Sequence, residues 1–338
     1  MGRCGQTDQT EDDFRLQKGL AITDPSGSVL LYGTDMTNNN DNRQKSTRSA
    51  LFLFMASLIW GVAFVAQRVG MDYVGPFTFN AVRNLIGALV LLPCIAFLDR
   101  IRGKSFTAER PLSGRKNEKR ILLEGGIVTG SFLAVASNLQ QVGIKYTTVG
   151  KAGFITAMYI VLVPLLGVFL KRRTSWKLWL SVVLAVIGLY LLSLAGGSVT
   201  LEKGDAFVLL CALAFAFQIM AVDKYAALTD GVRLACLEFA VCGLLTLFLM
   251  LIFEHPTPAA IWAARGPILY AGVLSSGVAY TFQILGQKGL NPTVASLIMS
   301  LESVISVLAG WIILGQTMSG REITGCVIMF AAIILAQI

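Results

Sequence analysis

The chain has 338 residues, of which 55% are hydrophobic and 14% are charged, and its formal net charge is +8. A soluble domain carries roughly 25% charged residues, so this chain has too little polar surface for a water-soluble globule. The basic residues gather in short links between apolar runs, which is typical of membrane proteins and gives no reason to expect a nucleic-acid partner. Six cysteines without paired spacing and a single histidine, His255, leave little material for a metal site. We therefore expect no catalytic residues, no metal and no cofactor.

Residues 1–49 differ in composition from the rest of the chain. They are polar, include the run Asn38–Asn39–Asn40, and show no sustained apolar period. Such a segment cannot bury enough apolar surface to offset the entropy of ordering, which predicts a disordered cytoplasmic tail. Met36 lies shortly before Leu51 and opens a plausible short leader, so residues 1–35 are a candidate extension from an upstream start.

Ten apolar runs follow the tail, each close to the roughly 20 residues that a membrane-spanning helix needs. The predicted helices cover residues 50–68, 74–98, 121–142, 148–170, 175–195, 204–224, 232–253, 266–286, 292–314 and 322–338. A transmembrane barrel would instead show alternating segments of about ten residues. The sequence thus predicts an all-α integral membrane protein with ten transmembrane helices.

The basic residues alternate between the two sides of the predicted membrane. The tail and every second link carry 21 Lys and Arg residues, eight of them in link 99–120, while the remaining links carry 6. Leaving out Arg3, Arg15 and Lys18 of the distal tail still gives 18 against 6. Because cytoplasmic loops carry the excess of basic residues, we expect both termini in the cytoplasm and the chain in the plasma or inner membrane.

The chain repeats itself at one constant offset in residue number, which we call the repeat shift. The repeat shift superimposes Gln140 on Gln283, Gly143 on Gly286, Lys145 on Lys288, Ala152 on Ala295 and Gly167 on Gly310. Chance identity among small residues in apolar sequence is the alternative explanation. Because each half has an odd number of helices, a true repeat must be inverted, with residues 50–195 as the first five-helix half and 204–338 as the second. Inverted repeats are typical of alternating-access transporters that bind substrate at mid-membrane.

Several short motifs in this order resemble the EamA-type family of the drug/metabolite transporter superfamily. They are residues 58–66 around Trp60–Gly61, residues 76–79 followed by Arg83, residues 300–304 around Glu302, and Leu314–Gly315–Gln316. Ser303 and Gln316 depart from the proline and glutamate that are usual in the family. The resemblance implies two inverted five-helix repeats, a central cavity, and export or uptake of small organic molecules, without choosing among amino acids, metabolites and drugs.

Glu302 is the candidate coupling residue. It lies ten residues inside its predicted span, on one helical stripe with Met299, and its repeat partner is Tyr159. A charge at mid-bilayer costs about 2.5–3.5 kcal/mol on insertion scales, so it usually faces a cavity or a partner. Desolvation there disfavours the charged form, as a proton-coupling site needs. A purely structural carboxylate is the alternative.

Arg83 shares one helical turn with Asn80 and could bind an anionic substrate group. The alternative is a fixed ion pair with Glu238 or Glu302. Further candidates for the cavity wall are Trp60, Phe64, Asn138, Gln141, Tyr159, Gln218, Glu238, Tyr280, Gln283 and Met299. Gln140, Gln287, Phe154 and Phe215 could line it as well. Hydrogen bonding between helices is the alternative role for the amides, and packing or lipid contact for the aromatic residues.

These observations predict a secondary transporter for a small organic metabolite or drug-like molecule. Its expected partners are that small-molecule substrate and the lipid bilayer, with protons as candidate coupling ions and a homodimer as a candidate assembly. The sequence lacks a Gly-x-x-x-x-Gly-Lys-Ser/Thr motif, so we expect no ATP hydrolysis. An uncoupled facilitator or channel and a non-transporting membrane protein are the alternatives. An intramembrane enzyme would need histidines or a serine–histidine pair at depth.

Overall fold

The structure is a computed structural model that describes residues 21–23, 29–31, 34–102, 112–147, 149–171, 175–193, 203–288, 290–314 and 319–337. The chain divides into two compact units, Met1–Arg48 and Ser49–Ile338. In the first unit, strands β1 (Ala21–Thr23) and β2 (Val29–Leu31) pair antiparallel.

The polar tail has more structure than its composition predicts. Helix α2 spans Thr34–Gly70, so residues 34–49, expected to be disordered, are helical. Extending an existing helix costs far less than nucleating one, and the apolar part of α2 provides that nucleus.

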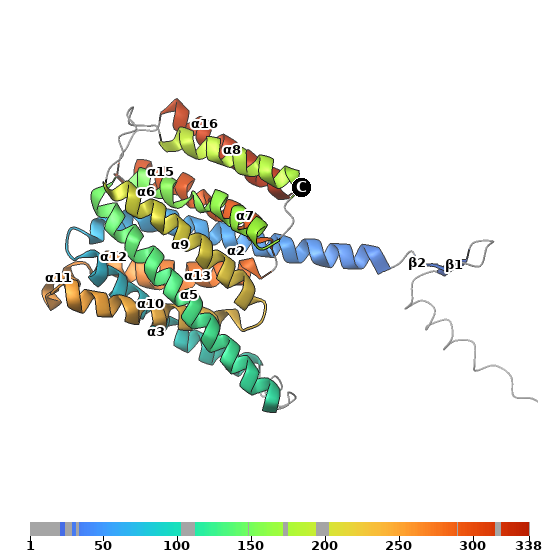
Figure 1. The fold of residues 1–338 in the computed structure, drawn as a ribbon, viewed down its shortest axis with the longest axis horizontal. Coiled ribbons are helices and arrows are strands. Elements are labelled where there is room, and N and C mark those ends of the chain that lie inside the picture. The colour runs from blue at the N-terminus through green and yellow to red at the C-terminus, as the bar shows by residue number, and fades with distance from the viewer. Residues whose placement is uncertain are drawn as a thin grey trace, which may run out of the picture. The chain divides into compact units, whose positions relative to one another are not determined.

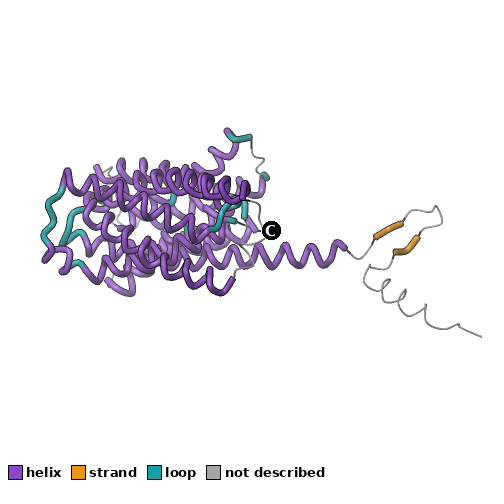
Figure 2. The backbone as a smooth tube through the Cα atoms, turned by 90° about the horizontal axis from the view of Figure 1, so that it is seen from below, coloured by secondary structure: helices purple, strands orange, loops and turns teal. Residues whose placement is uncertain are grey.

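Figure 1 colours the helices in chain order from blue to red, and Figure 2 shows that most of them run side by side. After α2 they are α3 (Pro76–Arg102), α5 (Leu112–Tyr146), α6 (Val149–Thr156), α7 (Tyr159–Phe169), α8 (Trp176–Ser193), α9 (Lys203–Ala226), α10 (Gly231–Phe253), α11 (Pro258–Ala263), α12 (Arg265–Leu269), η2 (Tyr270–Ala279), α13 (Tyr280–Gln287), α14 (Pro292–Met299), α15 (Leu301–Leu314) and α16 (Gly320–Gln337).

Eight helical segments of the described residues are long and apolar enough to cross a membrane. They correspond to every predicted span except the fifth and the tenth, where shorter apolar helices cover Trp176–Leu191 and Ile323–Ala336. Large apolar side chains such as Phe169 and Ile312 remain 82% and 73% exposed, which suits a surface covered by lipid and not by water. The protein is a multi-pass membrane protein.

Two of the predicted spans are interrupted at equivalent places. The span 148–170 is divided into α6 and α7 around Ala157, and the span 292–314 into α14 and α15 at Ser300. The repeat shift carries Ala157 onto Ser300, and so the first break onto the second. Ser57 of α2 donates through its hydroxyl to the carbonyl oxygen of Ile298 at 3.0 Å, just before the second break. An apolar run does not reveal such a break, because hydropathy is blind to the backbone hydrogen bonds.

The predicted span 266–286 is also not a plain α-helix, because η2 is a π-helix. Such segments are rare in proteins as a whole, but many of those that occur lie at functional sites. Here η2 lies close to α3: a Cβ atom added at Gly87 would lie 2.7 Å from the Ser276 Cβ, and one added at Gly272 would lie 3.0 Å from the Arg83 carbonyl oxygen. The π-helix therefore adjoins the backbone of the buried arginine.

Spans with the same place in the two predicted halves pack on one another: α3 contacts α10 and α8 contacts α16. In the two broken spans the contacts cross, because α7 contacts α14 and α6 contacts α15. Figure 1 shows α8 and α16 as an adjacent pair. The repeat glycines also make matching contacts. Gly143 of α5 packs against Gly204 and Val208 of α9, while Gly286 of α13 packs against Ser49 and Leu53 of α2. Matching spans and matching glycines of the two predicted halves therefore lie in helix contacts.

Candidate functional site: a central cavity

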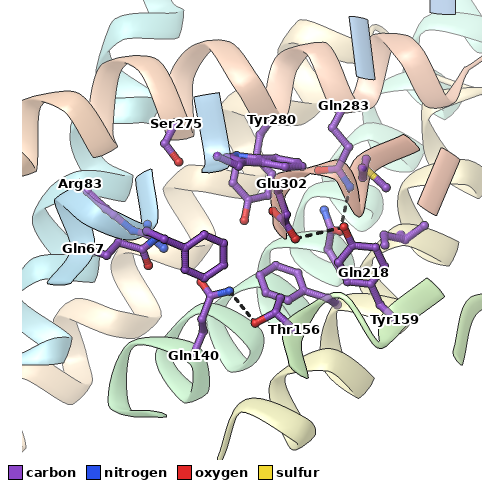
Figure 3. A pocket seen from close by; sticks show the side chains of 15 residues that line it. Gln67, Arg83, Gln140, Thr156, Tyr159, Gln218, Ser275, Tyr280, Gln283 and Glu302 are labelled. Carbon is purple, nitrogen blue, oxygen red and sulfur yellow. Dashed lines mark hydrogen bonds between the residues drawn. The ribbon is translucent and has the colours of Figure 1, made fainter. Parts of the chain in front are cut away.

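One cavity lies at the centre of the helices and encloses about 470 Å³ of empty space, including the part that is open to solvent. Figure 3 shows the side chains that surround it. They are Trp60, Phe64 and Gln67 of α2, Arg83 of α3, Gln140 of α5, Thr156 of α6, Tyr159 of α7, Phe215, Gln218 and Ile219 of α9, Ser275 of η2, Tyr280 and Gln283 of α13, Met299 of α14 and Glu302 of α15. Both predicted halves of the chain contribute to its wall.

Most of the predicted site residues meet in this cavity. Those that line it are Trp60, Phe64, Arg83, Gln140, Tyr159, Phe215, Gln218, Tyr280, Gln283, Met299 and Glu302. Sequence reasoning overlooked Gln67, Thr156, Ile219 and Ser275 as cavity residues. The repeat could have identified Thr156, because the repeat shift superimposes it on Met299, whereas a lone serine or isoleucine carries no signal.

The carboxylate of Glu302 meets the other half of the chain directly. Glu302 is 6% exposed, and its Oε1 accepts a hydrogen bond from the Tyr159 hydroxyl at 3.1 Å. Each residue lies in the first turn after a helix break. The first turn of a helix favours negative charge, so the start of α15 suits a carboxylate.

Arg83 is buried without an ionic partner. It is 3% exposed, and within the described residues it forms no ion pair with Glu238 or Glu302. Its Nε has no hydrogen-bond partner there, and its guanidinium lies 5.9 Å from the centre of the Phe79 ring. The fixed ion pair considered from the sequence is therefore absent, because Glu302 turns toward Tyr159 and Glu238 toward α9. The guanidinium is left facing the cavity (Figure 3).

Glu238 of α10 does not line the cavity, contrary to expectation, and is 0% exposed. Its Oε1 accepts a hydrogen bond from Gln218 Nε2 at 2.7 Å. Gln218 Oε1 in turn accepts one from Gln283 Nε2 at 3.1 Å. Helix α10 packs mainly against α3 and α5, and its Glu238 carboxylate reaches the cavity wall only through two amides.

Asn80, Asn138 and Gln141, which were also candidates for the cavity wall, do not line this cavity. Asn80 Nδ2 donates to the Ser137 carbonyl oxygen at 2.8 Å and to Asn138 Oδ1 at 3.0 Å. Asn138 Nδ2 donates to Thr246 Oγ1 at 2.8 Å, and Gln141 Nε2 donates to the Gln67 carbonyl oxygen at 3.3 Å. These amides join α2, α3, α5 and α10. Their role is the alternative one, hydrogen bonding between helices.

The apolar part of the wall is aromatic. Trp60 and Tyr280 meet edge to face with ring centres 4.7 Å apart, and Phe239 supports Tyr280 from behind at 5.3 Å. Phe64 and Phe215 complete this side. An aromatic wall binds apolar groups and, through the ring faces, cations.

Several polar atoms of the cavity wall are buried without a partner in the described structure. They are the donors Trp60 Nε1 and Arg83 Nε and the acceptors Gln67 Oε1 and Gln283 Oε1. Leaving such a group unpaired costs about 1–3 kcal/mol. The cavity is therefore built to receive a ligand or water with both donors and acceptors. Among the described residues, no three His, Cys, Asp or Glu side chains are grouped so as to hold a metal ion.

The model of the EamA-like transporter family matches residues 47–194 and 202–337. The chain belongs to the EamA-like transporter family. The resemblance seen in the sequence motifs is thus confirmed, although Gly315 and Gln316 of the last motif lie outside the described residues.

Three relatives and one solved structure illustrate the similarity of this EamA-like chain to other proteins. An "Uncharacterized transporter" of Archaeoglobus fulgidus is 28% identical and covers 85% of both chains. A "Probable terminal-alkyne amino-acid exporter" of Streptantibioticus cattleyicolor is 23% identical over 86% of this chain and 94% of the relative. A "Probable glucose uptake protein GlcU" of Priestia megaterium is 27% identical over 63% and 77%. One crystal structure matches with a TM-score of 0.67 at 18% identity, covering 86% and 96%, which shows a shared fold.

Proposed function

We propose that this protein is a proton-coupled secondary transporter for a small zwitterion with an apolar side group, such as an α-amino acid. It would work by alternating access, with ten spans in two inverted repeats, residues 50–195 and 204–338, and with both termini in the cytoplasm. One observation carries the proposal: a single cavity holds a buried, unpaired Arg83 and a buried Glu302 among aromatic side chains.

Three repeat pairs support the two-fold arrangement. Gln140 and Gln283, Thr156 and Met299, and Tyr159 and Glu302 are each related by the repeat shift, and all six line the cavity. The breaks between α6 and α7 and between α14 and α15 lie beside the cavity as well. Discontinuous helices at the interface of two repeats are typical of the substrate sites of such transporters. A ligand held between the halves contacts both, so its binding can favour one conformation over another.

The charges of the cavity favour a zwitterion over a neutral or singly charged molecule. A carboxylate can pair with the Arg83 guanidinium through two parallel hydrogen bonds. An ammonium group can pair with Glu302, and an apolar side group fits against Trp60 and Tyr280. A neutral sugar would leave the buried guanidinium without a counter-charge, which is costly. The names of the relatives include both an amino-acid exporter and a glucose uptake protein, so kinship does not choose between these classes.

Glu302 would couple transport to protons by binding either the substrate ammonium group or a proton, one at a time. Its buried carboxylate needs a positive partner or a proton, because an isolated buried charge is expensive. The ammonium group of the substrate is the positive partner. When the substrate leaves, a proton binds to the carboxylate in its place. Since the two cannot occupy the same carboxylate together, substrate moves one way and a proton the other. The Tyr159 hydroxyl can remain hydrogen-bonded to the carboxyl group in both states.

The test is counterflow in proteoliposomes with radiolabelled L-phenylalanine as the probe. We expect saturable uptake that is stimulated by phenylalanine on the opposite side. Phenylpropionate lacks the ammonium group and phenethylamine lacks the carboxylate, so each should compete at least about tenfold more weakly, as the loss of about 1.4 kcal/mol predicts. Flux that neither saturates nor responds to exchange would identify a channel. No phenylalanine uptake, or equal competition by glucose, would reject the zwitterion.

A further inference from the structure

The buried carboxylate of Glu238 is connected to the cavity although it does not line it. The path runs from Glu238 in α10 through Gln218 in α9 to Gln283 in α13, with hydrogen bonds of 2.7 and 3.1 Å. The two glutamines belong to the cavity wall (Figure 3). We call these three residues the amide relay.

The carboxylate sets the direction of every bond in the amide relay. A carboxylate oxygen accepts hydrogen bonds, whereas a glutamine amide has one end that donates and one that accepts. Gln218 must therefore turn its NH2 group to Glu238 and its carbonyl away. Gln283 then turns its own NH2 group to that carbonyl. The bond from Gln218 to Glu238 is the shorter of the two, and its direction requires only that Glu238 Oε1 carries no proton.

This order of hydrogen bonds decides which end of the Gln283 amide remains free. With its NH2 group engaged, Gln283 keeps its Oε1 free, and that atom is buried without a partner in the described structure. Gln283 is 2% exposed, so this acceptor is available to a ligand in the cavity and hardly to bulk water. A ligand donor there would satisfy it, whereas a ligand acceptor would face it across an unfavourable contact.

We propose that Glu238 determines substrate specificity through this relay, by making Gln283 present a hydrogen-bond acceptor and not a donor to the ligand. The inference rests on the proposed function, because it assigns the substrate's ammonium group, or another N–H donor, to Gln283 as well as to Glu302. Glu238 acts as a positioning residue, since Gln218 and Gln283 stand between it and the ligand.

Replacing Glu238 by glutamine removes the dictated direction. The new amide can donate to Gln218 Oε1, which turns the Gln218 NH2 group toward Gln283 and frees the Gln283 NH2 group for the cavity. The probes are L-phenylalanine and phenylpyruvate, which carry an ammonium donor and a ketone acceptor at the same carbon. In E238Q the preference for phenylalanine over phenylpyruvate in counterflow competition should fall by about tenfold, equivalent to one hydrogen bond of about 1.4 kcal/mol. The isosteric change Glu254→Gln, at a carboxylate outside the relay, is the matched control and should keep the preference.

A second measurement tests the relay without any ligand. Glu238 and Gln283 have Gln218 between them, so their coupling must pass through its amide. In detergent, the melting shifts of Glu238→Gln and Gln283→Met should be non-additive, and the Gln218→Met background should abolish that coupling. Additive shifts would overturn the relay. An unchanged ratio of phenylalanine to phenylpyruvate in E238Q would overturn its role in specificity. Absence of phenylalanine transport by the unaltered protein would instead reject the proposed function, while the melting cycle still decides on the relay.

Discussion

Tyr159 and Glu302 lie 143 residues apart in the chain, and the Tyr159 hydroxyl donates a hydrogen bond of 3.1 Å to Glu302 Oε1. This separation equals the repeat shift that superimposes the two halves of the sequence. Equivalent positions that touch one another must lie beside any two-fold axis that relates the halves. The pair is chemically unequal, because only one member is a carboxylate. The two members of this pair therefore differ in charge although the repeat shift makes their positions equivalent.

Replacing Glu302 by glutamine keeps its size and its hydrogen bond to Tyr159 but removes the proton-binding carboxylate. If one carboxylate binds the proton and the ammonium in turn, pH-gradient-driven accumulation of phenylalanine should be lost. Exchange should persist at saturating substrate with an affinity reduced about tenfold, as the loss of a charged partner predicts. Both activities are measured on the same proteoliposome preparation. Unchanged pH-driven accumulation would end the coupling proposal, and Glu302→Ala controls for folded yield.

Replacing Arg83 should affect only ligands that carry a carboxylate. Arg83→Met keeps much of the aliphatic volume and removes the guanidinium. Phenylalanine and phenylpropionate should compete about tenfold or more weakly, whereas phenethylamine should be unaffected, because it has no group for Arg83 to bind. Competition against labelled phenylalanine in wild type and variant gives the comparison. An equal loss for all three ligands would indicate that Arg83 supports the fold and not the anionic group.

Glu254 should stabilise the start of α3 without taking part in transport. Its carboxylate accepts from the backbone N–H groups of Phe77 and Thr78 at 3.0 and 2.7 Å and from the Thr78 hydroxyl at 2.6 Å. A negative charge at a helix N-terminus is favourable. Glu254→Ala should lower stability by about 1–2 kcal/mol, measured as a lower melting temperature in detergent. A melting temperature equal to that of the wild type would contradict the capping role.

The repeat glycines should tolerate no side chain. A Cβ atom at Gly286 would lie 2.7 Å from Leu53 Cγ and 2.8 Å from the Ser49 carbonyl oxygen, and one at Gly143 would lie 3.0 Å from the Gly204 carbonyl oxygen. Overpacking of this kind costs about 1–3 kcal/mol. Gly143→Ala and Gly286→Ala should each lower the melting temperature by a similar amount. Gly266→Ala is the control, because nothing lies within 4 Å of its added Cβ.

The orientation proposed from the basic residues can be checked in intact cells. Ser113 belongs to the predicted basic link 99–120, and a cysteine there should react with an impermeant maleimide only in inside-out vesicles. Labelling of Ser113→Cys from outside intact cells would reverse the assignment of both termini to the cytoplasm.

Sequence alone was sufficient for properties that depend on local composition. Insertion of a helix into a bilayer depends on the hydropathy of one continuous run, so eight of the predicted spans agree with the long apolar helices of the structure. The repeat shift also made Tyr159 the equivalent of Glu302, whereas the hydrogen bond between them is seen only in the structure. Burial of Glu302 and Arg83 also followed, since a charge inside an apolar run needs a cavity or a partner.

Only the tertiary structure decided where each side chain points and what it meets. Asn80, Asn138 and Gln218 are all amides in apolar runs, yet two of them join helices and one lines the cavity, because their partners come from helices distant in sequence. The breaks near Ala157 and at Ser300 are equally hidden, since hydropathy does not record which backbone groups lose their helical partner. Glu238 and Glu302 look alike in the sequence. The packing of α10 against α3 and α5 places Glu238 outside the cavity, and the helix break before α15 places Glu302 inside it.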